Sequence, residues 1–339
     1  MLLVTGGTGF VGSHVARRLC EEGFAVRVLA RRSSPLQLLD SLPVEIAIGD
    51  LLDAESLRKA VAGCEAVFHV AADYRLWASD PREIYRNNVD GTEQVLAAAR
   101  AAGVGRVVHT STVGTIGFHA DGTPATEADF PDRAALVGAY KTSKFQAEQA
   151  ALRYAGEGFP VVVVNPSAPV GEGDRKPTDT GKIIADFVNR KMPAYLDTGL
   201  NLVDVRDVAE GHLLAYRHGR PGERYILGGR NMDFKEILDA LARITGVPSP
   251  WLRMPYSVAW LAGVANGAVA KITGRRPMVP LDGVRIARYK MYVRSDKAEH
   301  ELGYRSGPVE AALERAVEWF REHGYTNIGH TNRGYTNKG

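Results

Sequence analysis

Short apolar runs alternate with helical patterns along the first half of this chain. The runs are nearly free of charge, as expected for strands of a parallel sheet that helices cover on both faces. The predicted strands are Leu2–Thr5, Ala25–Leu29, Val44–Ile48, Ala66–Val70, Arg106–Ser111 and Pro160–Asn165. The predicted helices are Val11–Glu22, Ala54–Ala62, Glu83–Ala102 and Ala134–Ala155. This order predicts an α/β fold with an open, doubly wound parallel sheet.

The second half follows a different pattern. After residue 165, loops and isolated helices surround one predicted strand, Arg224–Leu227, and the helices are Phe234–Thr245 and Val309–Glu322. We expect a smaller, partly helical C-terminal lobe that binds substrate over residues 165–323, with a return segment to the sheet near 200–228. The last residues, 324–339, form a five-residue repeat without a hydrophobic period, which predicts an irregular tail.

Composition excludes several classes of protein. The 339 residues are 45% hydrophobic and 24% charged, which is typical of a globular protein. A formal net charge of +3 argues against a dedicated nucleic-acid binder, which needs a concentrated basic face. The two cysteines, Cys20 and Cys64, lack the spacing of a disulfide framework or a metal site. We therefore expect no metal and a reducing, cytoplasmic location.

The longest uncharged run lies between Arg253 and Lys271 and covers residues 254–270. It is shorter and more polar than a membrane-spanning helix, which needs roughly 20 apolar residues. The run predicts a buried or interface helix, with contact at a membrane surface as the alternative.

A glycine-rich segment follows the first predicted strand directly and leads into the first helix. Gly6, Gly9 and Gly12 have the spacing GxxGxxG. Without a Cβ atom, the backbone can turn tightly and approach a pyrophosphate, whose charge is stabilised by the helix N-terminus. This predicts a Rossmann dinucleotide-binding domain over 1–164. The cofactor residues expected here are Gly6, Thr8, Gly9, Phe10, Val11 and Gly12.

The residues that follow the second, third and fourth strands indicate which dinucleotide the site prefers. NAD sites usually place an acidic residue after the second strand, whereas this chain has Arg31 and Arg32 there. Two guanidinium groups suit a 2′-phosphate, so NADP(H) is favoured and NAD(H) is the alternative. We expect Asp50-Leu51 to contact the adenine and Ala71-Ala72 to let the backbone pass close to the cofactor.

A YxxxK motif supplies the candidate catalytic pair, Tyr140 and Lys144. A spacing of four residues places both side chains on one helical face. A tyrosine with a pKa of roughly 10 is a poor base at neutral pH. A nearby ammonium group and a positive nicotinamide would lower that pKa towards the working pH. Lys144 could also bind the nicotinamide ribose.

A hydroxyl group after the fifth strand would stabilise charge on the reacting oxygen. Thr112 is the first candidate and Ser111 the second. His109 has a strand position and is interpreted as a packed histidine. Asn88 is a candidate for holding a proton-relay water, with a polar position inside the helix as the alternative.

These motifs together resemble the extended short-chain dehydrogenases/reductases over residues 1–323. The resemblance implies the catalytic roles of Thr112, Tyr140 and Lys144, and cofactor contacts at Pro166 and Ser167. The matching segments are TGGTGFVG at 5–12, GDL at 49–51, HVAA at 69–72, NNVDGT at 87–92, HTST at 109–112, YKTSK at 140–144 and NPS at 165–167.

Segments 73–78, 194–203 and 209–212 are similar to the hopanoid-associated sugar epimerases, which lie close to the dihydroflavonol 4-reductase-like enzymes. The resemblance implies hydride transfer at a secondary alcohol or ketone of a sugar or sugar-like substrate, and epimerisation is the first expectation. The alternatives are an NADPH-dependent carbonyl reductase of the dihydroflavonol 4-reductase type and, below it, a non-catalytic dinucleotide-binding module.

Several polar and aromatic residues are candidate substrate contacts, because aromatic faces stack on rings and amides bind hydroxyl groups. They are Tyr74, Trp77, Asn165, Tyr195 and Asn201. The resemblance also implies a homodimer, in which the helices at Glu83–Ala102 and Ala134–Ala155 pair across a two-fold axis.

Overall fold

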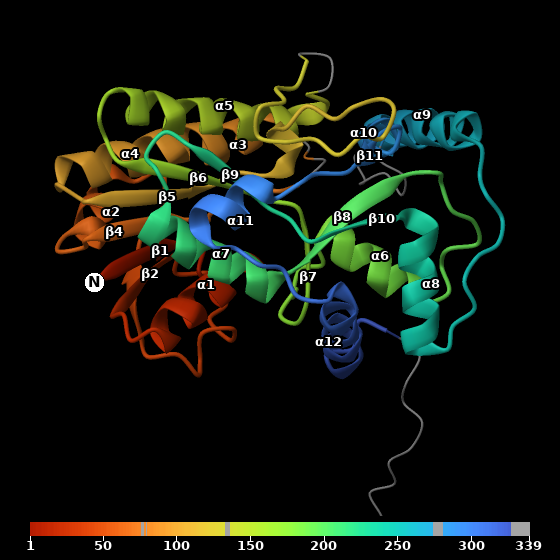
Figure 1. The fold of residues 1–339 in the computed structure, drawn as a ribbon, viewed down its shortest axis with the longest axis horizontal. Helices are drawn as coiled ribbons and strands as arrows, with labels where there is room; N and C mark the ends of the chain where they lie inside the picture. Colours follow the sequence, from red (N-terminus) through yellow and green to blue (C-terminus); the bar gives the residue numbers. More distant parts are fainter. Residues whose placement is uncertain (76–77, 79, 133–135, 274–280, 327–339) are drawn as a thin grey trace, which may run out of the picture.

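A seven-stranded parallel sheet forms the larger part of the molecule (Figure 1). The computed structural model describes residues 1–326 apart from 76–77, 79, 133–135 and 274–280. The strand order β3-β2-β1-β4-β5-β6-β9 reverses direction of winding at β1, which confirms the doubly wound prediction. The strands are β1 (Leu2–Thr5), β2 (Val26–Ala30), β3 (Val44–Ile48), β4 (Ala66–His69), β5 (Arg106–Thr110), β6 (Val161–Pro166) and β9 (Arg224–Leu227).

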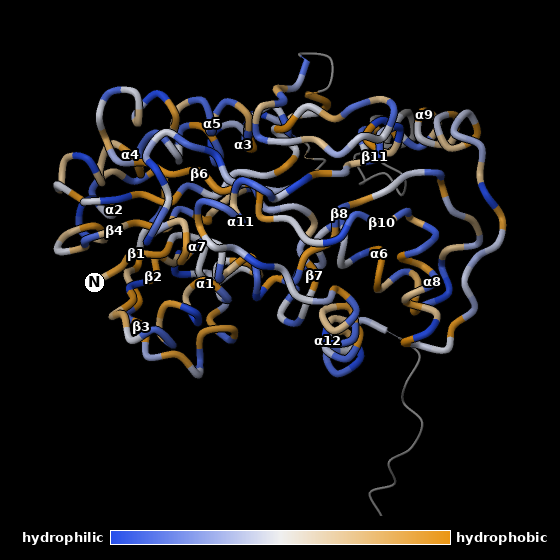
Figure 2. Tube along the Cα trace, viewed as in Figure 1, coloured by the Kyte–Doolittle hydropathy of each residue, from blue (hydrophilic) through white to orange (hydrophobic). Residues whose placement is uncertain are grey.

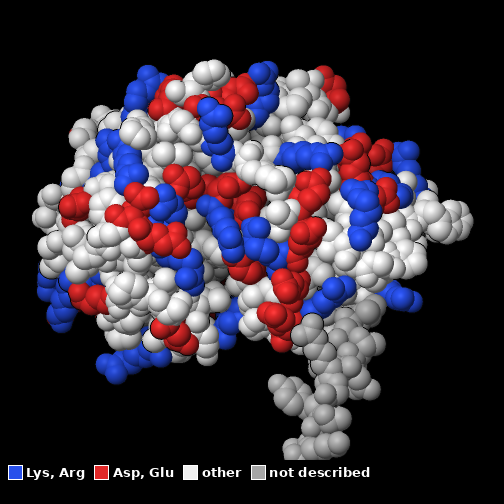
Figure 3. All heavy atoms as spheres, turned by 60° about the horizontal axis from the view of Figure 1, so that its bottom comes forward, with Lys and Arg blue, Asp and Glu red and all other residues white. Residues whose placement is uncertain are grey.

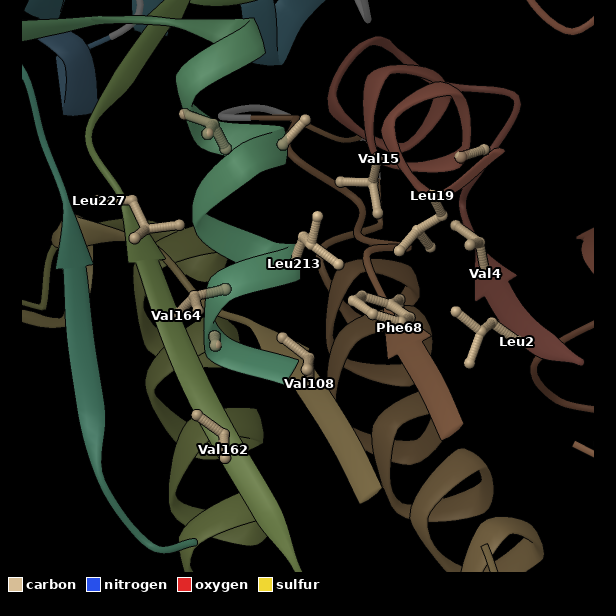
Figure 4. Packing of buried hydrophobic residues seen from close by; sticks show 14 of the residues in the cluster. Leu2, Val4, Val15, Leu19, Phe68, Val108, Val162, Val164, Leu213 and Leu227 are labelled. Atoms are coloured by element: carbon tan, nitrogen blue, oxygen red, sulfur yellow. The ribbon is translucent and has the colours of Figure 1, made fainter. Parts of the chain in front are cut away.

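Helices cover both faces of this sheet, and side-chain alternation along the strands explains the two cores. Leu2 and Val4 of β1 pack with helices α1 and α7, whereas Leu3 packs with α2, α4 and α5. Figure 4 shows the first of these cores, with Leu213 of α7 among the strand residues. The helices are α1 (Phe10–Glu21), α2 (Ala54–Val61), α4 (Gly91–Ala101), α5 (Gly138–Gly156) and α7 (Val205–His218).

The helix expected over Glu83–Ala102 is three segments. A short helix α3 (Arg82–Tyr85) leads into a π-helical turn, η1 (Arg86–Asp90), before α4 begins. Asn87 and Asn88 both lie in η1 and both hydrogen-bond to Asp73. Two consecutive side chains of this wider turn therefore bond to the same loop, and single π-helical turns of this kind are frequent at functional sites.

The second half contains a small mixed sheet that the sequence pattern did not predict. Strand β8 lies at its centre, antiparallel to β10 and parallel to β7 and β11. Helices α6, α8 and α12 cover it and close a second apolar core. The elements are β7 (Ala168–Val170), α6 (Asp179–Val188), β8 (Gly199–Asp204), β10 (Arg230–Asp233), α8 (Phe234–Thr245), β11 (Lys290–Met291) and α12 (Val309–Glu322).

Three segments of the second half pack on the large sheet. Within the expected return segment, α7 and β9 join it, whereas β8 belongs to the small sheet. A later helix, α11 (Asp296–Leu302), also contributes Ala298 and Leu302 to the first core. The chain thus crosses between the two sheets more than once, so neither sheet is formed by one continuous stretch.

Ion pairs connect the two sheets at the junction between β8 and α7. Arg315 of α12 donates to Glu172 (2.9 Å) and to Asp204, and Arg206 donates to Glu172 (2.8 Å). His14 of α1 bonds to the Glu172 carbonyl at 2.9 Å. Basic and acidic side chains also lie beside one another over much of the face in Figure 3. The partners of Glu172 hold the pKa of its carboxyl down at about 2, although burial opposes them.

We expect Arg315→Met to lower the free energy of unfolding at neutral pH by about 1–3 kcal/mol, because two partly buried carboxylates lose a charged donor. Urea denaturation measures the change. Glu172 has a lowered pKa, so its contribution is present above pH 4.5 and is lost as pH falls towards about 2. The control is Arg230→Met, which breaks an exposed pair with Glu310 and should change stability by less than about 1 kcal/mol. Equal losses in both variants would contradict the interpretation.

Candidate active site

The glycine-rich turn between β1 and α1 has no room for side chains. Gly6 has a left-handed φ of +72°, and a Cβ atom there would lie 2.6 Å from the Ala71 nitrogen. A Cβ atom on Gly12 would lie 2.1 Å from the Gly6 carbonyl oxygen. Gly9 caps α1 without a side-chain hydrogen bond, and no acidic residue lies in the first turn. The helix N-terminus therefore offers its backbone donors and positive dipole to an anion.

The carboxyl ends of β1, β4, β5 and β6 lie at one edge of the sheet, because these neighbouring strands are parallel. Thr5 links two of them: its hydroxyl bonds to His69 at 2.8 Å and accepts from the Ala71 nitrogen at 3.3 Å. Ser167 follows β6, is 8% exposed, and its Oγ has no hydrogen-bond partner among the described residues. An unpaired buried hydroxyl at this edge fits a ligand that supplies the missing partner.

The residues after β2 and β3 are placed at the same edge. Arg31 and Arg32 are exposed, and the Arg31 backbone is fixed by the Ser34 hydroxyl at 3.2 Å. Neither guanidinium forms an ion pair within the described ranges. Asp50 accepts a hydrogen bond from the Leu52 nitrogen at 2.9 Å, so part of its carboxylate maintains the turn. Together with the glycine turn, these residues fit the adenine half of a dinucleotide.

The catalytic candidates lie on α5 and on the loop after β5. Tyr140 and Lys144 are one turn apart on α5, and the Thr112 side chain lies near enough to the Tyr140 phenol to lower the phenol's pKa. Ser111 is buried, with its Oγ 3.4 Å from the Thr115 hydroxyl. The structure therefore brings Thr112, rather than Ser111, to the tyrosine. Lys144 is buried and donates to the Thr110 carbonyl oxygen at 2.7 Å.

Burial determines the titration of both groups. It raises the pKa of Tyr140 to about 12, and the Thr112 side chain opposes the rise. It lowers the pKa of Lys144 to about 8, and the negative charge of Glu148 opposes the fall. The sequence predicted that Lys144 lowers the pKa of Tyr140. In the structure that pKa is raised, because the cost of removing a phenolate from water is the largest effect on it. Tyr140 is held as a protonated phenol.

The same helix carries a buried carboxylate, Glu148, that the sequence did not identify as a site residue. Glu148 is 0% exposed and accepts hydrogen bonds from Arg224 (2.9 Å), Thr115 (2.8 Å) and Asn165 (2.7 Å). The carbonyl oxygen of Thr112 accepts a hydrogen bond from Asn165 at 3.1 Å. It also lies 2.7 Å from the Thr115 hydroxyl, whose single proton it shares with Glu148. Glu148 thereby fixes the loop that carries Thr112. Only its position, four residues after Lys144, hinted at this role.

Asn88 holds the loop after β4. Its Oδ1 accepts from the Asp73 nitrogen at 2.7 Å, and its Nδ2 donates to the Asp73 carbonyl and to Ser143, both at 2.9 Å. Ser143 lies between Tyr140 and Lys144, so Asn88 connects the π-helical turn to the catalytic helix. These bonds use its amide donors and acceptor, whereas the proton-relay role stays a prediction.

Two buried histidines lie side by side in the strands below the site. The rings of His69 and His109 are 5.3 Å apart. Burial lowers the pKa of His69 to about 3 and that of His109 well below its usual value, so both are neutral. Neither His109 nitrogen has a partner in the described part of the chain. The geometry agrees with a packed histidine at 109.

Each described substrate candidate has its own set of partners. Tyr74 is exposed and donates to the Lys176 carbonyl at 3.1 Å, and Tyr195 pairs through its backbone with Leu252 and Met254. Asn165 belongs to the Glu148 network, and Asn201 is buried against Gly229 and Asn231. Both asparagines hold structure, and their predicted substrate contacts are untested. Trp77 and residues 327–339 lie outside the described residues.

Among the residues that the structure describes, no group of three or more His, Cys, Asp or Glu side chains is placed to hold a metal ion. No helix among those residues is long and apolar enough to cross a membrane.

Known proteins similar to this chain include two curated relatives that each match 95% of its length. The NAD dependent epimerase/dehydratase family model matches residues 2–228. A Synechocystis sp. protein named "Putative dihydroflavonol 4-reductase" is 48% identical, with 95% of each chain covered. Sterol demethylase protein B of Methylococcus capsulatus is 35% identical over 95% of this chain and 98% of its own. The structure of a nucleoside-diphosphate-sugar epimerase from Pseudomonas aeruginosa superposes with a TM-score of 0.80, at 28% identity, covering 96% and 99% of the two chains.

Proposed function

This chain belongs to the NAD-dependent epimerase/dehydratase family of extended short-chain dehydrogenases/reductases, and on that premise we propose that it is an NADPH-dependent reductase of ketones. Membership makes it an NAD(P)-dependent enzyme of the epimerase/reductase type. The choice of reduction rests on the 48% identical relative, which is named for a reductase, and on the basic turn after β2.

The preference for NADPH is carried by Arg31 and Arg32. Both are exposed at the carboxyl end of β2, where a carboxylate would otherwise bind a ribose hydroxyl. A 2′-phosphate would bring the negative charge that two unpaired guanidinium groups attract. Gly6, Gly9 and Gly12 would receive the pyrophosphate, and the Ser167 hydroxyl would find a partner on the nicotinamide half.

Reduction needs an acid, and Tyr140 is held in the acid form. Bound NADPH would supply a hydride to the carbonyl carbon. Tyr140 donates its phenolic proton to the carbonyl oxygen, and Thr112 donates a hydrogen bond to the same oxygen as it gains charge. The Lys144 ammonium stabilises the phenolate that Tyr140 leaves behind.

Epimerisation is the second candidate, supported by the family description and by the likeness to the P. aeruginosa structure. It uses the same residues, with Tyr140 first accepting a proton and later returning it. The predicted hopanoid-associated sugar epimerase belongs to this candidate. We favour reduction because the closer relative is named a reductase and because the chain raises the Tyr140 pKa. Dihydroflavonol and sterol, the compounds in the relatives' names, both have fused rings, so we propose a ring-bearing, largely apolar ketone.

We expect Tyr140→Phe to reduce kcat for ketone reduction by about 10²–10⁴-fold, because the variant lacks the proton donor. NADPH binding, followed by its fluorescence, should change little. The assay follows NADPH oxidation with ring-bearing ketones and analyses the stereochemistry of the product. One NADPH oxidised per alcohol formed supports reduction. Inversion of an alcohol without net oxidation would instead establish the epimerase, and unchanged turnover in Tyr140→Phe would refute both.

We expect the double variant Arg31→Ala/Arg32→Ala to bind NADPH about 10–100-fold more weakly, since a charge-assisted hydrogen bond is worth about 1.5–3 kcal/mol. NADH affinity should stay the same, because NADH lacks the 2′-phosphate. Titration with both nucleotides measures the ratio. A matched control is Arg58→Ala, an exposed arginine on α2. Equal weakening towards both nucleotides would overturn the assignment of NADPH.

We expect the rate of reduction to fall as pH rises through about 8, because Lys144 then loses its ammonium charge. Glu148→Gln should move this decline to lower pH, because Glu148 raises the Lys144 pKa. The readout is kcat against pH. The double variant Glu148→Gln/Arg224→Met should show the same shift without leaving an unpaired buried cation. Glu93→Gln, which removes a partly exposed carboxylate that pairs with Arg153 of α5, is the control. A shift to higher pH, or none, would contradict the role of Glu148.

A further inference from the structure

An apolar surface is exposed around helix α9 (Tyr256–Thr273) and the segment before it. Trp251 is 84% exposed and Leu261 is 62% exposed, although both side chains are large and hydrophobic. Figure 1 places α9 at the outer edge of the molecule. We call this the α9 surface and define it by Trp251, Leu252, Val258, Trp260, Leu261 and Val264.

The packing of α9 leaves most of its described side chains uncovered. Among residues 256–267, the buried ones are the small Ala259 and Gly263, one turn apart. Gly263 contacts Leu281 and Val284 of α10 (Leu281–Ile286), where an added Cβ would lie 3.2–3.4 Å away. A helix that is apolar on all sides normally lies in an apolar environment. Contiguous exposed patches of this kind mark sites of interaction.

The charge of the surrounding sequence selects the partner. Residues 250–290 contain seven Lys or Arg and one acidic residue, Asp282, a net charge of +6. Arg253 and Lys290 pair with Asp197 and Asp233 outside the segment, which leaves an excess of +4. The whole chain has a net charge of only +3, so the basic excess is still concentrated in this segment. Basic residues around an apolar helix complement the negative surface of a bilayer that contains anionic lipids. Tryptophan is also enriched where such a bilayer meets water.

We propose that the α9 surface docks onto an anionic lipid bilayer, with its tryptophan and leucine side chains inserted at the level of the headgroups. The chain lies on the membrane through this surface, and no described helix is suited to span it. This inference does not depend on the reaction that the active site catalyses.

Docking brings the bilayer close to the catalytic helix. Asp282 of α10 lies against Gly138, where an added Cβ would be 2.7 Å from its carboxylate, and Gly138 precedes Tyr140 by two residues. On the other side, the Tyr195 backbone pairs with Leu252 of the α9 surface at 3.0 Å. The membrane would therefore adjoin both the catalytic helix and a predicted substrate contact. If the proposed function holds, an apolar ketone could reach the site from the bilayer.

Co-sedimentation with vesicles tests the docking without any turnover. We expect the full chain to bind vesicles made of equal parts of phosphatidylcholine and phosphatidylglycerol, and to bind pure phosphatidylcholine more weakly. Binding should weaken with added salt, because the attraction is partly electrostatic. Trp251→Gln/Leu261→Gln should weaken binding by about tenfold or more, since two large apolar side chains no longer enter the bilayer.

The matched control is Ile48→Gln, which alters an equally apolar side chain, 52% exposed on β3. Strand β3 and helix α9 lie at opposite ends of the molecule (Figure 2), so this variant should bind vesicles like the parent chain. Absence of binding to anionic vesicles, or equal losses in both variants, would overturn the proposal. So would a dimer that Trp251→Gln/Leu261→Gln converts to a monomer, because the surface would then face a second copy. A failure of ketone reduction would leave the vesicle result standing, so the two proposals fail separately.

Discussion

The buried ion pair between Glu148 and Arg224 is the interaction on which the active site depends. A fully buried carboxylate is costly unless every oxygen is paired, and here an arginine, a threonine and an asparagine satisfy it. These partners come from β9, the loop after β5, and β6. The requirement to pair one charge therefore fixes α5 against two strands and the loop after a third, and Thr112 is held near Tyr140 as a consequence.

The parts of the fold that depend on residues close together in the sequence could be predicted from the sequence. Apolar runs predicted the sheet, and the glycine spacing located the turn, because both signals are local. The small sheet was missed, since β11 has two residues and β8 mixes polar with apolar side chains. The partner of Glu148 lies 76 residues away, and no spacing rule reaches across that distance. The π-helical turn at Asn88 likewise depends on a tertiary contact, with Asp73.

Burial shapes the chemistry as strongly as the identity of the side chains does. The same desolvation moves the pKa of Tyr140 up and that of Lys144 down, so both groups favour their neutral forms. A neutral phenol is ready to donate a proton. Glu148 preserves the charge of Lys144, which lies one turn from Tyr140 on α5, against this tendency. The network that positions Thr112 thus also supports the charge of Lys144.

The uneven distribution of charge along the chain would orient the molecule relative to an anionic bilayer. Residues 250–290 have a net charge of +6, which falls to +4 when their ion pairs with Asp197 and Asp233 are taken as neutral, and the rest of the chain then carries −1. Near an anionic bilayer, the basic segment is attracted and the rest is not, and the α9 surface turns towards the lipid before any side chain inserts. The same segment packs through α10 against the beginning of the catalytic helix. The basic segment, the side chains proposed to insert and the contact with the catalytic helix therefore lie on one side of the protein. The proposed uptake of an apolar ketone from a membrane requires this arrangement.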